Sequence, residues 1–371
     1  MKTISVELQP CLGKRSGIGT YIYEITKRLS NDPSLKIQGN VFNFCRKHDN
    51  REIYEDLGCP ILENSRIPYS VFRLSQYTVP ILYSRIFART DVNLFFNYII
   101  PEGVEGKVCV AIHDMSYLRF PDTLKKRNFL RLNYGIQRTV QQADRILTIS
   151  EFSKKEITEL LHISEDRISV IPCAAPMKRN GDSFSILAEK YGITKPYFLF
   201  VSTIEPRKNI VRLIRAFELV RKESNLSCQL VLAGGEGWNN DMIYKEVEKL
   251  TAKDDIIFTG YIADGEKTSL YENAECLVFP SLYEGFGIPP LEAMQYGCPV
   301  VCSSSASLPE IAGSAALFVD PYSVDSIAEG MIRLLSDHCL KTNLVKKGFE
   351  QVKKYSWDQS AEKLKEICKE L

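Results

Sequence analysis

Two carboxylates, Glu284 and Glu292, stand eight residues apart at the two ends of the glycine- and proline-rich stretch EGFGIPPLE. The prolines favour the start of a helix, with Glu292 in its first turn. The glycines leave backbone N–H groups open to an anion at that helix start. Carboxylates repel an anion unless hydroxyl groups engage them, so the stretch predicts a ligand that carries both phosphates and sugar hydroxyls. The alternative is that the acids only stabilise the helix start.

Two adjacent cations, Arg207 and Lys208, follow the apolar run YFLFV in the turn STIEPRKN. Solvation alone explains poorly why both would stand at the end of a buried strand. A diphosphate would engage both, because Arg forks onto two oxygens and Lys acts as a point charge. A solvated turn is the alternative reading.

A glycine turn, SGIGTYI, contains Gly17 and Gly19 just before the first long helical pattern. Ile22 stands where a dinucleotide fingerprint has its third glycine, so a nicotinamide cofactor is disfavoured. Backbone N–H groups at this helix start still suit an anion. The alternative is a plain glycine turn.

The pair His113-Asp114 directly follows the apolar run VCVAI. Open α/β sheets bind ligands at the carboxyl ends of their strands, so His113 is predicted to meet a ligand. Alternatively, Asp114 caps the next turn and His113 is a half-buried side chain with its hydrogen bonds satisfied. No other metal-ligating residue stands at ligand spacing beside the pair, so no metal site is predicted.

The elements that must position these residues alternate between short apolar runs and stretches of helical periodicity. Runs apolar on both faces indicate parallel strands covered by helices, which predicts a doubly wound α/β fold. The predicted strands are residues 108–112, 145–149, 197–201, 229–233, 256–258, 276–279 and 299–302, and the predicted helices are 20–29, 153–161, 209–223, 266–273, 290–296 and 326–336. A chain of 371 residues suggests two domains, and the pattern lapses between residues 171 and 197. We predict domains at 1–177 and 178–356.

Composition excludes several classes of protein. A net charge of +1 argues against a surface built for nucleic acid, and 44% hydrophobic with 25% charged residues is typical of a globular protein. The eleven cysteines contain no C-x-x-C pair, which favours reduced thiols in the cytosol. The start MKTISVELQP lacks the features of a secretory signal, so we predict a cytoplasmic protein.

Taken together, these motifs resemble the GT-B glycosyltransferases of family four. The similarity lies in the E-x7-E of Glu284 and Glu292, in EPRKN, in VLAGG at residues 231–235, in FTGYI at 258–262, in SEFSKKEI at 150–157 and in the glycine turn. The resemblance implies two Rossmann-like doubly wound domains facing across a cleft. It also implies a terminal helix, residues 357–371, that packs back on the first domain.

The resemblance further implies roles for individual residues. Glu292 would accept hydrogen bonds from ribose hydroxyls, Glu284 would contact hydroxyls of the donor sugar, and Arg207 and Lys208 would hold the diphosphate. Gly-Arg stands in many members where this chain has Ser202-Thr203, so diphosphate binding would rest more heavily on that cationic pair. The other expected contacts are backbone groups of Phe286, Gly287 and Ile288 at the sugar and phosphate, the segment Gly260, Tyr261 and Ile262 at the nucleobase, Gly17 and Gly19 near the phosphates, and His113 near the sugar.

By the same resemblance, the reaction is a metal-independent hexosyl transfer that retains the anomeric configuration. The donor would be a nucleotide sugar acting as co-substrate, and no other cofactor is expected. Ser-Thr before EPRKN resembles a subset that includes mannosyl and rhamnosyl transferases, so GDP-mannose is the first candidate. The acceptor would be a saccharide or a lipid-linked saccharide in surface polysaccharide biosynthesis.

Three other classes remain as alternatives. A nucleotide-sugar epimerase of GT-B form would use the same donor groups but would also need acid/base carboxylates in the first domain. A dehydrogenase is disfavoured by Ile22, and a sugar-nucleotide-binding protein without activity is disfavoured by the presence of both glutamates and both cations.

Two basic segments of the first domain predict contact with an anionic membrane. Residues 66–89 hold Arg66, Arg73, Arg85 and Arg89 without an acid, interleaved with Tyr69, Phe72, Tyr77, Tyr83 and Phe87, and Lys125, Lys126, Arg127 and Arg131 follow with Phe129 and Leu132. The protein would then lie on the inner face of the cytoplasmic membrane. An ordinary acceptor-binding surface, which also contains Arg and aromatic residues, is the alternative.

Overall fold

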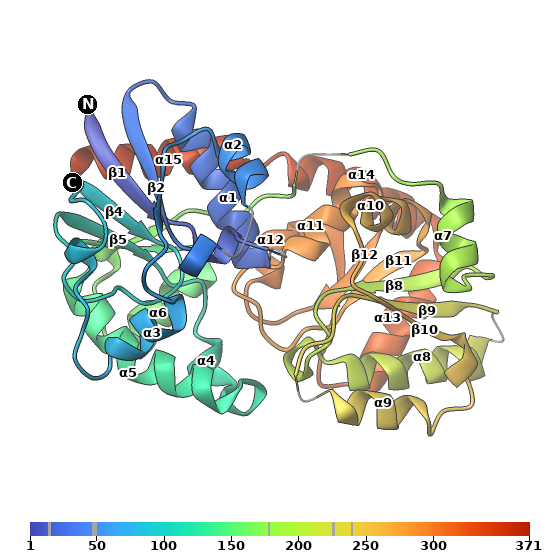
Figure 1. Ribbon diagram of the computed structural model, residues 1–371. Helices are drawn as coiled ribbons and strands as arrows, with labels where there is room; N and C mark the ends of the chain where they lie inside the picture. Colours follow the sequence, from blue (N-terminus) through green and yellow to red (C-terminus); the bar gives the residue numbers. More distant parts are fainter. Residues whose placement is uncertain (14–15, 47–49, 177–178, 225–226, 239) are drawn as a thin grey trace. The chain divides into compact units, whose positions relative to one another are not determined.

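The computed structural model describes residues 1–13, 16–46, 50–176, 179–224, 227–238 and 240–371. The chain divides into two compact units (Figure 1). The first contains Met1–Tyr117, Lys126–Cys173 and Ser356–Leu371, and the second contains Leu118–Lys125 and Ala174–Tyr355. The predicted border between residues 177 and 178 lies outside the described residues.

The first unit is built on a seven-stranded parallel sheet with the order β3-β2-β1-β4-β5-β6-β7. Its strands are β1 (Lys2–Glu7), β2 (Leu35–Phe42), β3 (Ile61–Asn64), β4 (Val92–Phe95), β5 (Lys107–Ala111), β6 (Arg145–Thr148) and β7 (Ile168–Val170). The order reverses between β1 and β4, and open α/β sheets bind ligands at such a switch point.

Six of this unit's helices are α1 (Gly17–Ser30), α2 (Arg51–Leu57), α3 (Tyr69–Ser75), α5 (Lys126–Gln142), α6 (Glu151–Leu161) and α15 (Trp357–Glu370), while α4 (Ser116–Arg119) spans the border of the two units. The short 3-10 turns of this unit are η1 (Gln9–Cys11), η2 (Phe44–Arg46), η3 (Tyr83–Arg85) and η5 (Glu165–Arg167), whereas η4 (Pro121–Thr123) belongs to the second unit. Helix α1 begins three residues before the predicted 20–29, because the Ser16 hydroxyl caps it by accepting the N–H of Gly19. The terminal helix α15 packs against α1.

The second unit has a six-stranded parallel sheet with the order β10-β9-β8-β11-β12-β13. Its strands are β8 (Tyr197–Val201), β9 (Gln229–Ala233), β10 (Ile256–Gly260), β11 (Cys276–Phe279), β12 (Val300–Ser303) and β13 (Ala316–Val319). Strands β8, β9 and β11 have the predicted bounds. Every residue of these three strands is buried, so both faces must be covered by helices.

The helices of the second unit cover both faces of its sheet, with α8 and α13 on one side and α10 and α11 on the other (Figure 1). They are α7 (Phe184–Tyr191), α8 (Ile210–Ser224), α9 (Asp241–Val247), α10 (Asp264–Asn273), α11 (Ile288–Gln295), α12 (Leu308–Ala312), α13 (Val324–Ser336) and α14 (His338–Val352), with 3-10 turns η6 (Pro206–Lys208), η7 (Lys253–Asp255) and η8 (Gly313–Ala315). Within the described residues, no helix is long and apolar enough to cross a membrane.

Candidate functional site

Two turns meet at the carboxyl edge of the second sheet, because they follow the neighbouring strands β8 and β11. The cationic turn carries Arg207 and Lys208, and the acidic turn carries Glu284. The N–H of Leu282 donates to the carbonyl of Arg207 at 3.0 Å, and the amide of Asn209 donates to the carbonyl of Pro280 at 2.9 Å. These bonds fix one turn against the other, although their residues lie more than seventy positions apart in the chain.

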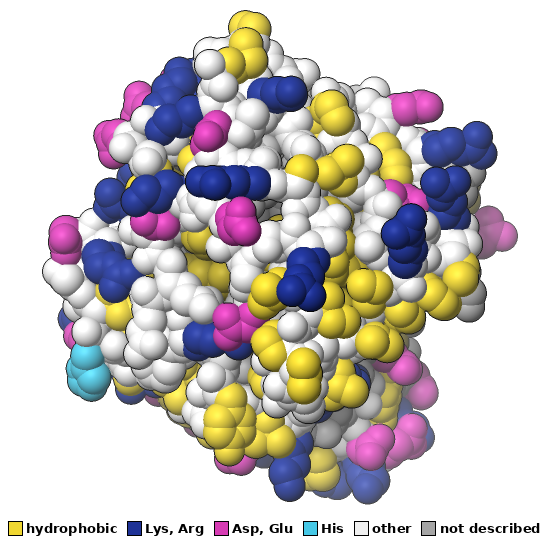
Figure 2. Space-filling view, turned by 60° about the vertical axis from the view of Figure 1, so that its left-hand side comes forward, with side chains coloured by type: hydrophobic (Ala, Val, Ile, Leu, Met, Phe, Trp, Pro, Cys, Tyr) yellow, Lys and Arg dark blue, Asp and Glu magenta, His cyan; other side chains and the backbone are white. Residues whose placement is uncertain are grey.

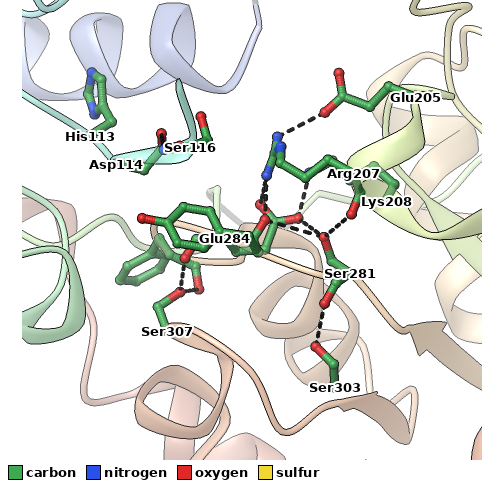
Figure 3. Close-up of polar contacts among 12 residues, drawn as sticks. His113, Asp114, Ser116, Glu205, Arg207, Lys208, Ser281, Glu284, Ser303 and Ser307 are labelled. Carbon is green, nitrogen blue, oxygen red and sulfur yellow. Dashed lines mark hydrogen bonds and ion pairs between the residues drawn. The ribbon is translucent and has the colours of Figure 1, made fainter. Parts of the chain in front are cut away.

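Glu284 lies at the centre of a buried polar cluster (Figure 3). Lys208 Nζ donates to its Oε1 at 2.6 Å, and Arg207 Nη1 donates to its Oε2 at 3.2 Å. The hydroxyl of Ser281 also donates to Oε1, at 2.5 Å. The second guanidinium nitrogen of Arg207 bonds Glu205 Oε1 at 2.9 Å. Both predicted phosphate-binding cations therefore contact the predicted sugar-binding carboxylate, and Glu205 is a fourth charged member that the sequence analysis did not assign.

The formal charges of this cluster cancel, since two cations lie against two carboxylates. Burial by itself would raise the pKa of Glu284, but Lys208, Arg207 and the hydrogen bonds lower this pKa to about 2. Burial lowers the pKa of Lys208, and the charge of Glu284 opposes that change. Glu284 is thus ionised at neutral pH, which makes it a hydrogen-bond acceptor and a very weak base.

Two further serines hold the acidic turn in shape. Ser303 donates from its hydroxyl to the carbonyl of Ser281 at 2.6 Å. The Ser307 hydroxyl lies 2.9 Å from the carbonyl of Glu284 and 2.8 Å from that of Phe286, so its one proton is shared between them. Serines on neighbouring strands and loops carry no distinctive sequence pattern, which is why the sequence analysis missed them.

The helix that follows the turn begins earlier than predicted. Helix α11 starts at Ile288 rather than at residue 290, because Pro289 and Pro290 fit within a first turn, where no backbone N–H donor is needed. Glu292 therefore lies in the second turn, which corrects its predicted place in the first. Gly287 has a φ of 103°, and a Cβ there would come within 2.5 Å of a Leu308 methyl carbon, so this position requires glycine.

Glu292 is buried in a different cluster, with two residues of α10. Lys267 Nζ donates to its Oε1 at 2.6 Å, and the Tyr271 hydroxyl donates to its Oε2 at 3.0 Å. Burial lowers the pKa of Lys267, but the Glu292 charge and hydrogen bond outweigh burial and raise it overall. Lys267 and Tyr271 stand four residues apart and so share a helix face, which is the only sequence signal that points to them.

The predicted nucleobase segment, Gly260 to Ile262, begins at the last residue of β10. The strand ends at Gly260, which has a φ of 70°. Its carbonyl accepts the N–H of Gly234 at 3.0 Å, which ties it to the end of β9. Tyr261 is exposed and Ile262 is buried. The segment thus lies at the same sheet edge as the Glu284 cluster, two strands from β8.

In the first unit, Gly17 and Gly19 form the first turn of α1. A Cβ at Gly17 would meet no atom within 4 Å, so packing inside this unit does not require glycine there. Close approach of a ligand to the backbone at Gly17 remains a prediction.

His113 follows β5 and is buried against aromatic rings. Its Nε2 lies 2.6 Å from the Phe96 carbonyl, and Tyr21 meets the ring edge-on with centroids 5.4 Å apart. Burial lowers the pKa of His113, so the ring is neutral at pH 7 and Nε2–H donates to that carbonyl. Asp114 accepts the N–H of Ser116, as the capping alternative predicts. Only Nδ1 is left to meet a ligand, and a contact with a donor sugar stays a prediction.

Comparison with protein families assigns the two halves of the chain to one kind of enzyme. Residues 15–179 match the family described as Glycosyltransferase Family 4, and residues 185–351 match Glycosyl transferases group 1. The O-antigen chain mannosyltransferase B of Escherichia coli is 35% identical over 266 residues, which cover 71% of this chain and 70% of that protein. The chain belongs to glycosyltransferase family 4. The serotype-specific mannosyltransferase WbdA of E. coli is 31% identical over 268 residues, which cover 70% of this chain but 33% of WbdA.

Solved structures show that this transferase has the GT-B fold. Sucrose-phosphate synthase from Thermosynechococcus elongatus matches with a TM-score of 0.77 and 16% identity, covering 100% of this chain and 99% of that one. Anabaena Alr3699/HepE, solved with UDP and glucose, matches with a TM-score of 0.75 and 14% identity, covering 100% of both chains.

Proposed function

We propose that this glycosyltransferase moves a hexose, with retention of configuration and without a metal ion, from a nucleoside-diphosphate sugar to a saccharide or lipid-linked saccharide during surface polysaccharide synthesis. GDP-mannose is the first candidate donor, and the relatives named as mannosyltransferases support it. The observation that carries the proposal is the buried cluster of Arg207, Lys208 and Glu284 at the carboxyl edge of the second sheet.

The cluster suits a leaving diphosphate. Arg207 and Lys208 are held in place by Glu284, so they are pre-organised before the donor binds. As the bond between the sugar anomeric carbon and the phosphate oxygen breaks, negative charge grows on the diphosphate, and fixed cations lower the energy of that state. The ionised Glu284 accepts hydrogen bonds from sugar hydroxyls.

We propose front-face displacement for the transfer itself. The acceptor hydroxyl oxygen bonds to the anomeric carbon on the face that the diphosphate leaves, and the departing phosphate oxygen takes the hydroxyl proton. No separate base is then required. A carboxylate with a pKa of about 2 is too weak a base for that task, which supports leaving Glu284 outside the proton transfer.

A nucleotide-sugar epimerase is the second candidate, because the first unit holds a buried carboxyl suited to acid/base work. Burial raises the pKa of Glu7 to about 7, even though Tyr69, Arg131 and Arg73 lower it. An epimerase would change the sugar nucleotide without an acceptor, whereas a transferase requires one. Analysis of the products with and without acceptor separates the two functions.

A thermal-shift screen of nucleotide sugars tests the donor. At a hundred times its dissociation constant, the true donor should stabilise the protein by about 2.7 kcal/mol. We expect GDP-mannose to give the largest shift, and an NMR spectrum of the product to show the donor's anomeric configuration. A protein that no nucleotide sugar stabilises, or an inverted product, would contradict the proposal.

The proposed membrane contact involves fewer aromatic residues than the sequence suggested. Phe72, Tyr83, Phe87 and Leu132 belong to the core of the first unit and cannot face a bilayer, because their rings and methyl groups pack inside it. The apolar side chains that are exposed there are Val71, Leu74, Tyr77, Val79, Leu130 and Tyr134. Figure 2 shows one face on which hydrophobic side chains lie among Lys and Arg.

We expect the protein to sediment with anionic vesicles and not with neutral ones, since each well-placed cation contributes about 1 kcal/mol. Leu74→Glu should weaken that binding by adding a charge on the exposed face of α3. Ile186→Glu is the matched control, because Ile186 lies on α7 of the second unit and both side chains are 66% exposed. Equal sedimentation with both vesicle types, or equal loss in both variants, would count against membrane contact.

A further inference from the structure

A pocket in the first unit opens at the carboxyl edge of its sheet. Glu7, at the end of β1, lies in it beside Tyr69 and Arg73 of α3, Tyr77 after that helix, and Arg131 of α5. The cavity has a volume of about 60 Å³ and is open to solvent. It lies at the end of β1, beside the switch point of the sheet.

The two arginines of this pocket lack the partners that buried cations usually have. Within the part of the chain that the structure describes, no carboxylate lies within ion-pair distance of Arg73 or Arg131, and the buried Nε of Arg131 has no hydrogen-bond partner. Arg73 lies over the Tyr69 ring, 5.6 Å from its centroid. This contrasts with Arg207, which forms two ion pairs. Half-buried guanidinium groups without a carboxylate partner favour a ligand that brings negative charge.

Glu7 is the one acid of the pocket, and it is 9% exposed. The hydroxyl of Tyr69 donates to its Oε1 at 3.4 Å. Its carboxyl faces Tyr69 and Arg73 on α3, Arg131 on α5, Tyr83 on η3 and the backbone of Gln9. Burial raises its pKa to about 7 despite the two arginines, so near neutral pH the protonated form is well populated and can donate a hydrogen bond.

We propose that this pocket binds an anionic group of the acceptor, a phosphate or a sugar carboxylate, between Arg73 and Arg131. The inference rests on the proposed transferase function, because it assigns the pocket to the acceptor. The planar guanidinium groups fork onto two anion oxygens, and the Tyr69 and Tyr77 rings offer apolar faces to the attached sugar. Protonated Glu7 donates to the anion, whereas ionised Glu7 repels it. Anion binding therefore tightens as the pH falls from 8 to 6.

The test is binding to the full chain of three probes: mannose 6-phosphate, glucuronate and neutral mannose. Thermal shift and isothermal titration give the affinities at pH 6 and pH 8. We expect one or both anions to bind and neutral mannose not to bind, and the two anions distinguish phosphate from carboxylate. Tighter binding of neutral mannose than of either anion would overturn the inference.

Variants assign binding to the pocket. Arg131→Gln should weaken anion binding at least tenfold. Arg131→Lys should give an intermediate loss, because lysine keeps the charge but cannot form the two parallel hydrogen bonds of a guanidinium group. Arg127→Gln is the matched control, since it removes the same charge from an exposed position on α5 and should change affinity less than twofold. Glu7→Gln should bind glucuronate, whose charge is constant over this range, equally at pH 6 and pH 8. Equal affinity in Arg131→Gln and the unmodified protein would overturn the inference, as would an unchanged pH effect in Glu7→Gln.

Donor binding, measured in the same variants, separates this inference from the proposed function. We expect Arg131→Gln to keep its affinity for the nucleotide sugar. If the donor binds and no anion does, the pocket assignment is wrong and the transferase function stands. If an anion binds in the pocket and no nucleotide sugar binds, the donor proposal fails and the pocket stands.

Discussion

Replacing Arg207 by alanine is expected to lower kcat by about a hundredfold to a thousandfold at saturating donor, the loss typical of one pre-organised electrostatic group. Arg207 spans Glu205 and Glu284 and is mostly buried, so its guanidinium cannot be replaced by a neighbour or by bulk water. Its charge matters most when the diphosphate departs, and the loss should therefore fall on kcat more than on donor affinity. Steady-state kinetics with varied donor measure both.

Two other variants sharpen this prediction. Arg215→Ala removes an arginine of α8 that pairs with Glu246 and has a half-exposed side chain, so kcat should change little. Glu292→Ala should act mainly through donor KM, because the proposed ribose contact changes little between ground and transition states. A folded, donor-saturated Arg207→Ala enzyme with full activity would show that the phosphate site lies elsewhere.

Replacing Lys208 by methionine is expected to reduce the free energy of unfolding by about 3–5 kcal/mol, because it breaks a buried ion pair and leaves an uncompensated charge. Lys208 and Glu284 are both about nine-tenths buried and 2.6 Å apart. The loss corresponds to a fall in Tm of roughly 6–20 °C for a domain of this size. Chemical denaturation at pH 7 measures it.

The pH dependence of stability and a variant of the partner residue Glu284 test this second prediction. The pKa of Glu284 is lowered from 4.5 to about 2 in the folded protein, so its stabilising contribution is full above pH 4.5 and is lost as the pH falls toward 2. The double variant Lys208→Met with Glu284→Gln should recover part of the loss, since no unpaired charge remains. Lys222→Met is the control, because the Lys222 side chain is 59% exposed where it pairs with Glu218, and its loss should cost less than about 1 kcal/mol. Equal losses at positions 208 and 222 would contradict the assigned role of burial.

The sequence by itself determined the α/β class, several strands of the second unit and the family. Strands β8, β9 and β11 could be predicted to the residue, because each is a short apolar run buried on both faces. Strands β1 and β2 were harder to recognise, because buried Ser5 and Asn40 interrupt their apolar pattern. The helix starts were displaced by two or three residues where a serine cap or a proline pair sets the first turn.

Only the tertiary structure decided which side chains share a site. The sequence named Arg207, Lys208 and Glu284 but assigned them to different parts of a ligand, whereas parallel strand pairing brings the three together as mutual partners. The tertiary structure separated Glu292 from these three residues and paired it with Lys267 of α10. It also gathered Glu7, Arg73 and Arg131 from segments more than fifty residues apart into one pocket. Local periodicity reports which face of an element is buried, and it contains no information about which distant element supplies the opposite charge.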